Sequence, residues 1–191
     1  MLTENLYGVS HKYLPDTICD DVVRRAKELQ TEEGCVGSVG VDKKTRDSRL
    51  VWLSDPWIYD WITPAVRELN SFLKWNFDIL FPENIQFTKY SENQFYNWHT
   101  DSTPKDEFNT RKISVVIPLV DSDQYEGGNL ELFDYAFKPD SKKEERIVSR
   151  EDFRQKGNMI LFPSYVWHRV TKITKGERLS MVIWYRGEKF K

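Results

Sequence analysis

Hydrophobic positions in the first part of the chain recur with helical spacing. Between Asp16 and Gly34 they fall every three or four residues, at Ile18, Val22, Val23, Ala26 and Leu29. This spacing places apolar side chains on one face of an α-helix. Asp16 is the predicted N-cap of this helix, and Gly34 is its predicted end.

A second helical pattern follows the start signal Ser54-Asp55-Pro56. Its apolar positions are Ile58, Trp61, Ile62, Val66, Leu69, Phe72 and Leu73. Pro64 lies inside this segment, and we expect it to break or kink the helix because proline cannot donate a backbone hydrogen bond. Between the two helices, the run from Arg49 to Leu53 predicts a β-strand.

After Pro82 the pattern changes to short runs rich in β-branched and aromatic residues. Turn-forming segments at 126–128, 155–157 and 175–177 help to separate these runs. Short strands with regular turns are typical of an antiparallel sandwich or barrel, such as a jelly roll. The predicted strands are 85–91, 94–101, 112–120, 129–135, 158–163, 167–173 and 178–186.

Together these elements predict a mainly β fold with N-terminal helices that pack against one sheet. A chain of 191 residues fits one domain with a real core. We therefore predict a single domain, 1–191, with a helical support at 1–80 and a β core at 81–191.

Composition limits the possible partners and location. The net charge of -2 gives no sign of a basic nucleic-acid surface, so we expect no nucleic-acid partner. Cys19 and Cys35 are too few for a disulfide framework. The N-terminus lacks the pattern of a signal peptide, and no apolar stretch is long enough for a membrane span. We expect a cytoplasmic protein with no membrane partner, whose oligomeric state the sequence does not indicate.

Two of the three histidines have features of metal ligands. His99 is followed by Asp101 in the stretch YNWHTD, and alternate residues of a strand face the same side. His168 begins a later predicted strand. Two histidines and one carboxylate form the facial triad of non-haem Fe(II) oxygenases, although the same ligands could hold zinc. His99 could also be a hydrogen-bonded histidine at a sheet edge. His11 has no evident partner, and we expect a surface or structural role for it.

A cationic residue lies on the strand after His168. Arg178 comes ten residues later and is followed by Ser180 in an Arg-x-Ser pattern, which places both on one face of a strand. Arginine binds carboxylates bidentately. An arginine near a triad of this type is suited to hold the distal carboxylate of a keto acid whose other end chelates the metal.

Taken in order, these residues resemble the 2-oxoglutarate- and Fe(II)-dependent oxygenases, and most closely their prolyl 4-hydroxylase-like branch. The resemblance runs from about Gln86 to Gly187. It rests on Tyr90, Tyr96, His99-x-Asp101, Arg111, Gly127-Gly128, Gly157 with Phe162, His168, Arg178 and Trp184.

The resemblance implies a double-stranded β-helix (jelly roll) flanked by helices. It implies that His99, Asp101 and His168 bind Fe(II), and that Arg178, Ser180 and Tyr90 bind 2-oxoglutarate. Residues that match the substrate groove of prolyl hydroxylases are Tyr96, Arg111 and Trp184, with Arg186 added as their neighbour on the same strand. The implied reaction consumes O2, hydroxylates a C–H bond of a prolyl residue in a peptide or protein, and releases succinate and CO2; ascorbate is a candidate further cofactor.

Several alternatives stay open at this point. The segment 126–132 departs from the family's usual Gly-Gly-Glu-Thr pattern, and the stretch between Asp101 and Arg111 is short, so the substrate could be a free amino acid or another small metabolite. A metal-binding jelly roll without oxygenase activity would keep the histidines but has no need for Arg178. A nucleic-acid demethylase would typically have a second arginine where this chain has Trp184. Taken singly, the aromatic residues could be core, and Arg111 could pair with Asp106 or Glu107 at the surface.

Overall fold

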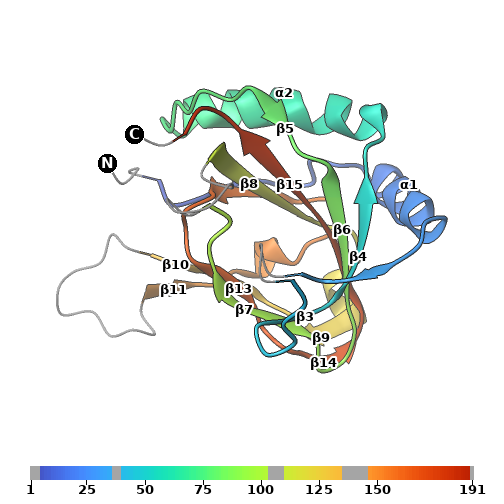
Figure 1. Cartoon of the computed structure of the whole chain (residues 1–191). Helices are drawn as coiled ribbons and strands as arrows, with labels where there is room; N and C mark the ends of the chain where they lie inside the picture. Colours follow the sequence, from blue (N-terminus) through green and yellow to red (C-terminus); the bar gives the residue numbers. More distant parts are fainter. Residues whose placement is uncertain (1–4, 36–39, 103–109, 135–145, 190–191) are drawn as a thin grey trace.

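The computed structural model describes residues 5–35, 40–102, 110–134 and 146–189, and within them the fold is mainly β (Figure 1). Two helices, α1 (Asp16–Lys27) and α2 (Pro56–Phe72), accompany antiparallel sheets. Neither helix is long and apolar enough to cross a membrane, within the residues described. Cys19 is buried and Cys35 is exposed, and both are free cysteines.

The largest sheet has eight strands, and every pairing in it is antiparallel. Its order is β1 (Gly8–Ser10), β12 (Met159–Pro163), β8 (Arg111–Pro118), β15 (Arg178–Arg186), β6 (Ile85–Tyr90), β4 (Arg49–Leu53) and β2 (Glu32–Glu33), with β5 (Phe81–Pro82) also paired to β15.

A second sheet of five strands carries the histidines. Its order is β11 (Ile147–Val148), β10 (Leu130–Phe133), β13 (His168–Val170), β7 (Phe95–His99) and β3 (Arg46–Asp47). A third sheet pairs β14 (Ile173–Gly176) with β9 (Tyr125–Gly127). Short 3-10 helices span Ser122–Gln124 and Glu151–Phe153.

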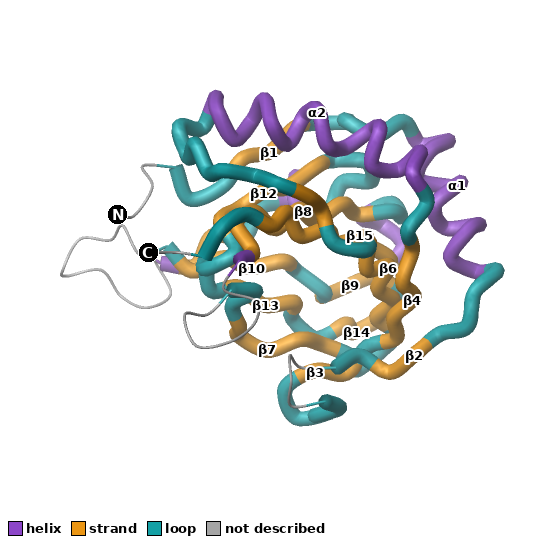
Figure 2. Tube along the Cα trace, turned by 45° about the horizontal axis from the view of Figure 1, so that its top comes forward, coloured by secondary structure: helices purple, strands orange, loops and turns teal. Residues whose placement is uncertain are grey.

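Both helices lie on the same side of the large sheet (Figure 2). Their apolar stripes and the facing side of the sheet form one buried cluster, and each fully buried aliphatic side chain contributes about 1.5–3 kcal/mol. The cluster includes Cys19, Val22 and Ala26 of α1, Ile58, Ile62 and Val66 of α2, and Met181, Ile183 and Tyr185 of β15.

Alternation along β15 decides what faces the opposite side. Met181, Ile183 and Tyr185 point to the helices, so the residues at the alternate positions of the strand point toward the second sheet. Those residues are Arg178, Ser180, Val182 and Trp184, and they line a pocket. The helices therefore bury one face of the sheet and leave its polar face for the pocket.

The predicted helix over 16–34 is correct in position but wrong at its C-terminal end. Asp16 is the first helical residue, Pro15 occupies the cap position, and the helix ends at Lys27. Gly34 instead lies beside β3, where a Cβ atom would come 2.3 Å from Ser48 Oγ and 2.7 Å from Arg46 Nε. This close approach, and not a helix stop, explains the glycine.

The predicted break at Pro64 does not occur, because α2 continues through it as one helix. Burial of Ile62, Ala65 and Val66 on the sheet offsets the missing backbone hydrogen bond. The strands at 49–53 and 178–186 have the predicted bounds. The predicted strand 167–173 is divided into β13 and β14, which belong to different sheets, and the strand predicted at 94–101 ends at His99.

Candidate metal centre and cosubstrate pocket

The strand register brings the two histidines together. His99, the last residue of β7, pairs directly with His168, the first residue of β13, and their ring centroids are 4.1 Å apart. Asp101 lies two residues beyond the end of β7, so strand alternation does not orient it. Instead its backbone N–H donates to the Ser164 carbonyl (2.9 Å), which directs the chain toward His168.

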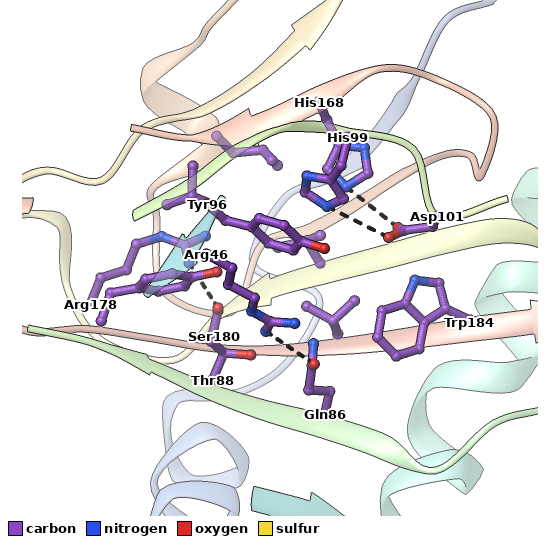
Figure 3. Close-up of a pocket in the computed structure, with 15 residues that line it drawn as sticks. Arg46, Gln86, Thr88, Tyr96, His99, Asp101, His168, Arg178, Ser180 and Trp184 are labelled. Carbon is purple, nitrogen blue, oxygen red and sulfur yellow. Dashed lines mark hydrogen bonds and ion pairs between the residues drawn. The ribbon is translucent and has the colours of Figure 1, made fainter. Parts of the chain in front are cut away.

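The three side chains point toward one another (Figure 3). His99 Nε2 is 3.7 Å from Asp101 Oδ1, and His168 Nε2 is 3.4 Å from Asp101 Oδ2. One ligand atom from each residue can be chosen so that all three lie within 4.8 Å of one another. This spacing suits a single metal ion.

Backbone carbonyls determine which nitrogen of each histidine is free. His99 Nδ1 lies 2.7 Å from the Asn97 carbonyl, and His168 Nδ1 lies 2.9 Å from the Val166 carbonyl. A carbonyl oxygen only accepts, so each Nδ1 carries the proton and each Nε2 has a free lone pair. Metal-binding histidines are oriented in this way by their second nitrogen.

The charges at the site match the needs of a divalent metal. Burial, together with the neighbouring His168, lowers the pKa of His99 to about 3. Burial alone would raise the pKa of Asp101, but its interactions with His168, His99 and Arg111 lower it to about 2. Ser114 also donates a hydrogen bond to Asp101 Oδ2 (2.7 Å). At neutral pH, His99 is therefore neutral and Asp101 is ionised, as metal binding requires.

Arg178 is the second notable group of the site. It is only 2% exposed, it donates to Ser180 Oγ (2.9 Å), and its guanidinium lies 5.7 Å from the centre of the Tyr90 ring. Among the described residues no carboxylate pairs with it. A buried cation without a counter-charge is costly, so this position is suited to an anionic ligand.

One pocket is lined by both the triad and Arg178 (Figure 3). Its walls come from both sheets, and only Asp101 among them is acidic. The lining residues are Arg46, Gln86, Thr88, Tyr90, Tyr96, His99, Asp101, Val116, Leu130, His168, Val170, Arg178, Ser180, Val182 and Trp184.

The four predicted substrate residues divide into two groups. Tyr96 lines the pocket and stacks on His99 with ring centroids 3.5 Å apart, and Trp184 lines it as well. Arg111 and Arg186 instead meet at Glu83, beside the pocket: Arg111 donates through Nε and Nη2, and Arg186 through Nε, each at 2.6 Å.

This ion-pair cluster touches the pocket through Trp184. The Arg111 guanidinium lies 3.9 Å from the centre of the Trp184 ring. The acidic partner of Arg111 in the structure is Glu83. Asp106 and Glu107, the acids considered from the sequence, lie outside the described residues. His11, expected at the surface, is largely exposed and has Nε2 3.9 Å from Asp152.

Sequence reasoning missed several polar residues of the site. Arg46 lies in a charged run without hydrophobic periodicity, so its two-residue strand gives no signal. Gln86 and Thr88 alternate with Ile85 and Phe87 in a predicted strand, and this alternation could have identified them. Ser114 belongs to a strand that is buried on both faces, and its contact with Asp101 depends on the fold.

Comparison with known proteins agrees with this geometry. The model of the 2OG-Fe(II) oxygenase superfamily matches residues 85–186, more than half of the chain. This protein therefore belongs to the 2OG-Fe(II) oxygenase superfamily, as its sequence predicted. Members of that family require Fe(II), 2-oxoglutarate and O2, and the two histidines, Asp101 and the buried Arg178 are suited to the first two.

Similar proteins include bacterial hydroxylases and prolyl hydroxylases. A PKHD-type hydroxylase of Teredinibacter turnerae is 33% identical over 113 residues, which is 56% of this chain and 45% of that protein. One from Alteromonas mediterranea is 32% identical over 106 residues, or 53% and 42% of the two chains. The matches thus span less than half the length of these curated relatives.

Solved structures show a likeness of fold. A Pseudomonas putida prolyl-4-hydroxylase has a TM-score of 0.73 at 19% identity, covering 97% of this chain and 94% of that one. A prolyl hydroxylase from Trichoplax adhaerens, in complex with a hypoxia inducible factor oxygen degradation domain peptide fragment, has a TM-score of 0.77 at 16% identity, covering 96% and 84%.

Proposed function

We propose that this protein is an Fe(II)- and 2-oxoglutarate-dependent dioxygenase that hydroxylates a prolyl residue in a peptide or protein, releasing succinate and CO2. The observation that carries the proposal is the presence, in one pocket, of a two-histidine, one-carboxylate group and a buried arginine without an acidic partner. A metal-binding jelly roll without oxygenase activity would not need that arginine.

In this proposal His99, Asp101 and His168 hold Fe(II). When bound by these residues, iron with its cosubstrate would supply the oxidising chemistry. Ser114 keeps the Asp101 carboxylate in place, and the carbonyls at Asn97 and Val166 keep the imidazoles oriented.

Arg178, Ser180 and Tyr90 bind the distal carboxylate of 2-oxoglutarate. The Arg178 guanidinium has further N–H groups besides the one that meets Ser180, and Tyr90 lies across from it on β6. Apolar groups of the pocket, such as Val116 and Leu130, exclude water around the reacting atoms.

Tyr96 and Trp184 form aromatic walls for the substrate, and Arg111 and Arg186 support Trp184 from the side of Glu83. A peptide substrate draws support from the Trichoplax adhaerens enzyme of similar fold, whose structure contains a peptide fragment. A free amino acid or other small metabolite is the second candidate, favoured by the departure of segment 126–132 from the prolyl hydroxylase pattern.

The proposal includes the finer features of the fold. The large sheet and the histidine-bearing sheet would be the two halves of a double-stranded β-helix, and residues 1–191 would form one domain. A cytoplasmic location is part of the proposal and rests on the two free cysteines. A requirement for ascorbate stays a prediction.

The test measures succinate formation from 2-oxoglutarate under air with Fe(II), in the presence of proline-containing peptides and free amino acids in turn. Wild type should produce succinate, and His99→Ala and Arg178→Ala should not. Arg169→Ala is the matched control, because Arg169 follows His168 but pairs with Glu131 outside the pocket (2.7 Å).

Measurements of metal binding and of 2-oxoglutarate binding show why each variant is inactive. His99→Ala should lose metal, whereas Arg178→Ala should keep metal and lose 2-oxoglutarate. Wild-type protein that binds iron but neither binds 2-oxoglutarate nor forms succinate would contradict the oxygenase assignment.

A further inference from the structure

Arg46 is a second buried arginine of the pocket, contributed by β3. It is 5% exposed. Its Nε donates to Ser48 Oγ (2.9 Å), Nη1 to the Cys35 carbonyl (3.0 Å) and Nη2 to Gln86 Oε1 (3.1 Å). All three acceptors are neutral, and no carboxylate among the described residues pairs with this guanidinium.

The guanidinium also lies close to the metal ligands. It lies over the Tyr96 ring at 4.5 Å from the ring centre, and His99 stacks on the same ring with centroids 3.5 Å apart. One aromatic ring therefore separates Arg46 from a metal ligand, and Figure 3 shows the guanidinium between Tyr96 and Gln86.

Arg46 contacts β6 at a different position from the one opposite Arg178. In the register of β6 and β15, Tyr90 is opposite Arg178, Thr88 is opposite Ser180, and Gln86 is opposite Val182. Gln86 is therefore four residues along from the cosubstrate arginine, about 13 Å at the rise of a β-strand. Arg46 and Arg178 are therefore anchored at different positions along the strands.

Charge around the pocket is unbalanced even when the cosubstrate is counted. Fe(II) with Asp101 would carry one positive charge, and the 2-oxoglutarate dianion with Arg178 would carry one negative charge, so these cancel. Arg46 then remains uncompensated. Glu83 is shared by Arg111 and Arg186, beside Trp184.

We propose that the substrate carries a carboxylate close to the carbon that is hydroxylated, and that Arg46 binds this carboxylate. The inference rests on the proposed function and narrows its substrate class. A guanidinium has five N–H donors, and only three of those of Arg46 are occupied by the contacts above. The free donors can bind a carboxylate without loss of the existing hydrogen bonds.

Two sources could supply this carboxylate: an acidic side chain next to the proline of a peptide, or the α-carboxylate of a free imino acid. The experiment compares Ala-Glu-Pro-Glu-Ala with Ala-Gln-Pro-Gln-Ala, both capped at their ends, and L-proline with L-prolinamide. Binding is measured to protein loaded with Mn(II) and 2-oxoglutarate under nitrogen, by tryptophan fluorescence, so that turnover is not needed.

We expect the acidic member of one pair to bind wild type at least about ten-fold more tightly than its amide, the effect of one hydrogen bond to a charged group. The pair that shows the difference identifies the source. Arg46→Gln should bring the ratio close to one while 2-oxoglutarate affinity changes by less than about two-fold. Arg46→Lys should restore part of the ratio, and Arg49→Gln, at an exposed arginine three residues away, should keep it.

Equal binding of acidic and amide members by wild type would overturn the inference, and this comparison does not depend on any variant folding. An unchanged ratio in Arg46→Gln would overturn the role of this residue. If wild type hydroxylates the neutral peptide as well as the acidic one, the proposed function stands and the inference fails. If no probe binds to protein that has bound 2-oxoglutarate, both the prolyl substrate and the inference are contradicted.

Discussion

The hydrogen bond from Ser114 to the Asp101 carboxylate allows a quantitative test of the metal site. The Ser114 side chain is 0% exposed, and its hydroxyl is 2.7 Å from Asp101 Oδ2 and 2.9 Å from Ser164 Oγ. The hydroxyl has one proton, and the ionised carboxylate can only accept. Ser114 therefore donates to Asp101, and Ser164 donates to Ser114.

Ser114→Ala removes a donor to a charged group and should weaken metal binding. A hydrogen bond to a charged group contributes about 1.5–3 kcal/mol, and loss of a partner of a metal ligand typically weakens metal affinity about 10–100-fold. We expect a loss in this range for Mn(II) or Fe(II), measured by anaerobic titration calorimetry.

Ser164→Ala is the matched control, because it removes a hydroxyl from the same buried chain but leaves the bond to Asp101. It should weaken metal binding by less than about three-fold, since its hydrogen bond is neutral. Equal metal affinity in wild type and Ser114→Ala would refute the assignment of Ser114 as the residue that positions Asp101. Equal losses in both variants would show a general effect of packing instead.

Three further predictions concern the ligand set, an ion-pair cluster and a turn. Asp101→Ala should abolish both iron binding and hydroxylation, and hydroxylated product from this variant would count against the triad. The bonds from two arginines lower the pKa of Glu83 despite its burial, so ionised Glu83 stabilises the fold above the pKa of an unfolded glutamate, and this stabilisation is lost as pH falls. Between pH 7 and pH 4, the free energy of unfolding measured in urea should therefore fall more for wild type than for Glu83→Gln. Gly157 has φ +77°, and a Cβ there would be 2.3 Å from the Leu14 carbonyl oxygen; Gly157→Ala should therefore lower stability by at least about 1 kcal/mol in thermal unfolding, and an unchanged Tm would contradict this strain.

Periodic elements with one buried face were predictable from the sequence. β15 was found at its bounds because Met181, Ile183 and Tyr185 alternate with residues of the other face. The strands β2, β3, β5 and β11 have two residues each, too few for any period, and their pairing depends on neighbours distant in sequence.

The candidate metal ligands were identifiable because few residue types bind iron and the chain has only three histidines. Their orientation was not, since Asp101 is directed by a hydrogen bond to Ser164 and not by strand alternation. The placement of Arg111 was missed for a similar reason. Its partner Glu83 is 28 residues away and follows β5, and the two residues meet because β15 pairs with both β5 and β8.

The position of β15 has a consequence for synthesis of the chain. It follows every other strand of the described chain in sequence, yet it lies inside the large sheet, between β8 and β6. Until it leaves the ribosome, both of these strands expose unpaired backbone groups, which are sites of edge-to-edge aggregation. The large sheet is therefore expected to form completely only after β15 has been synthesised. A nascent chain arrested before Arg178 should depend on chaperones that cover strand edges.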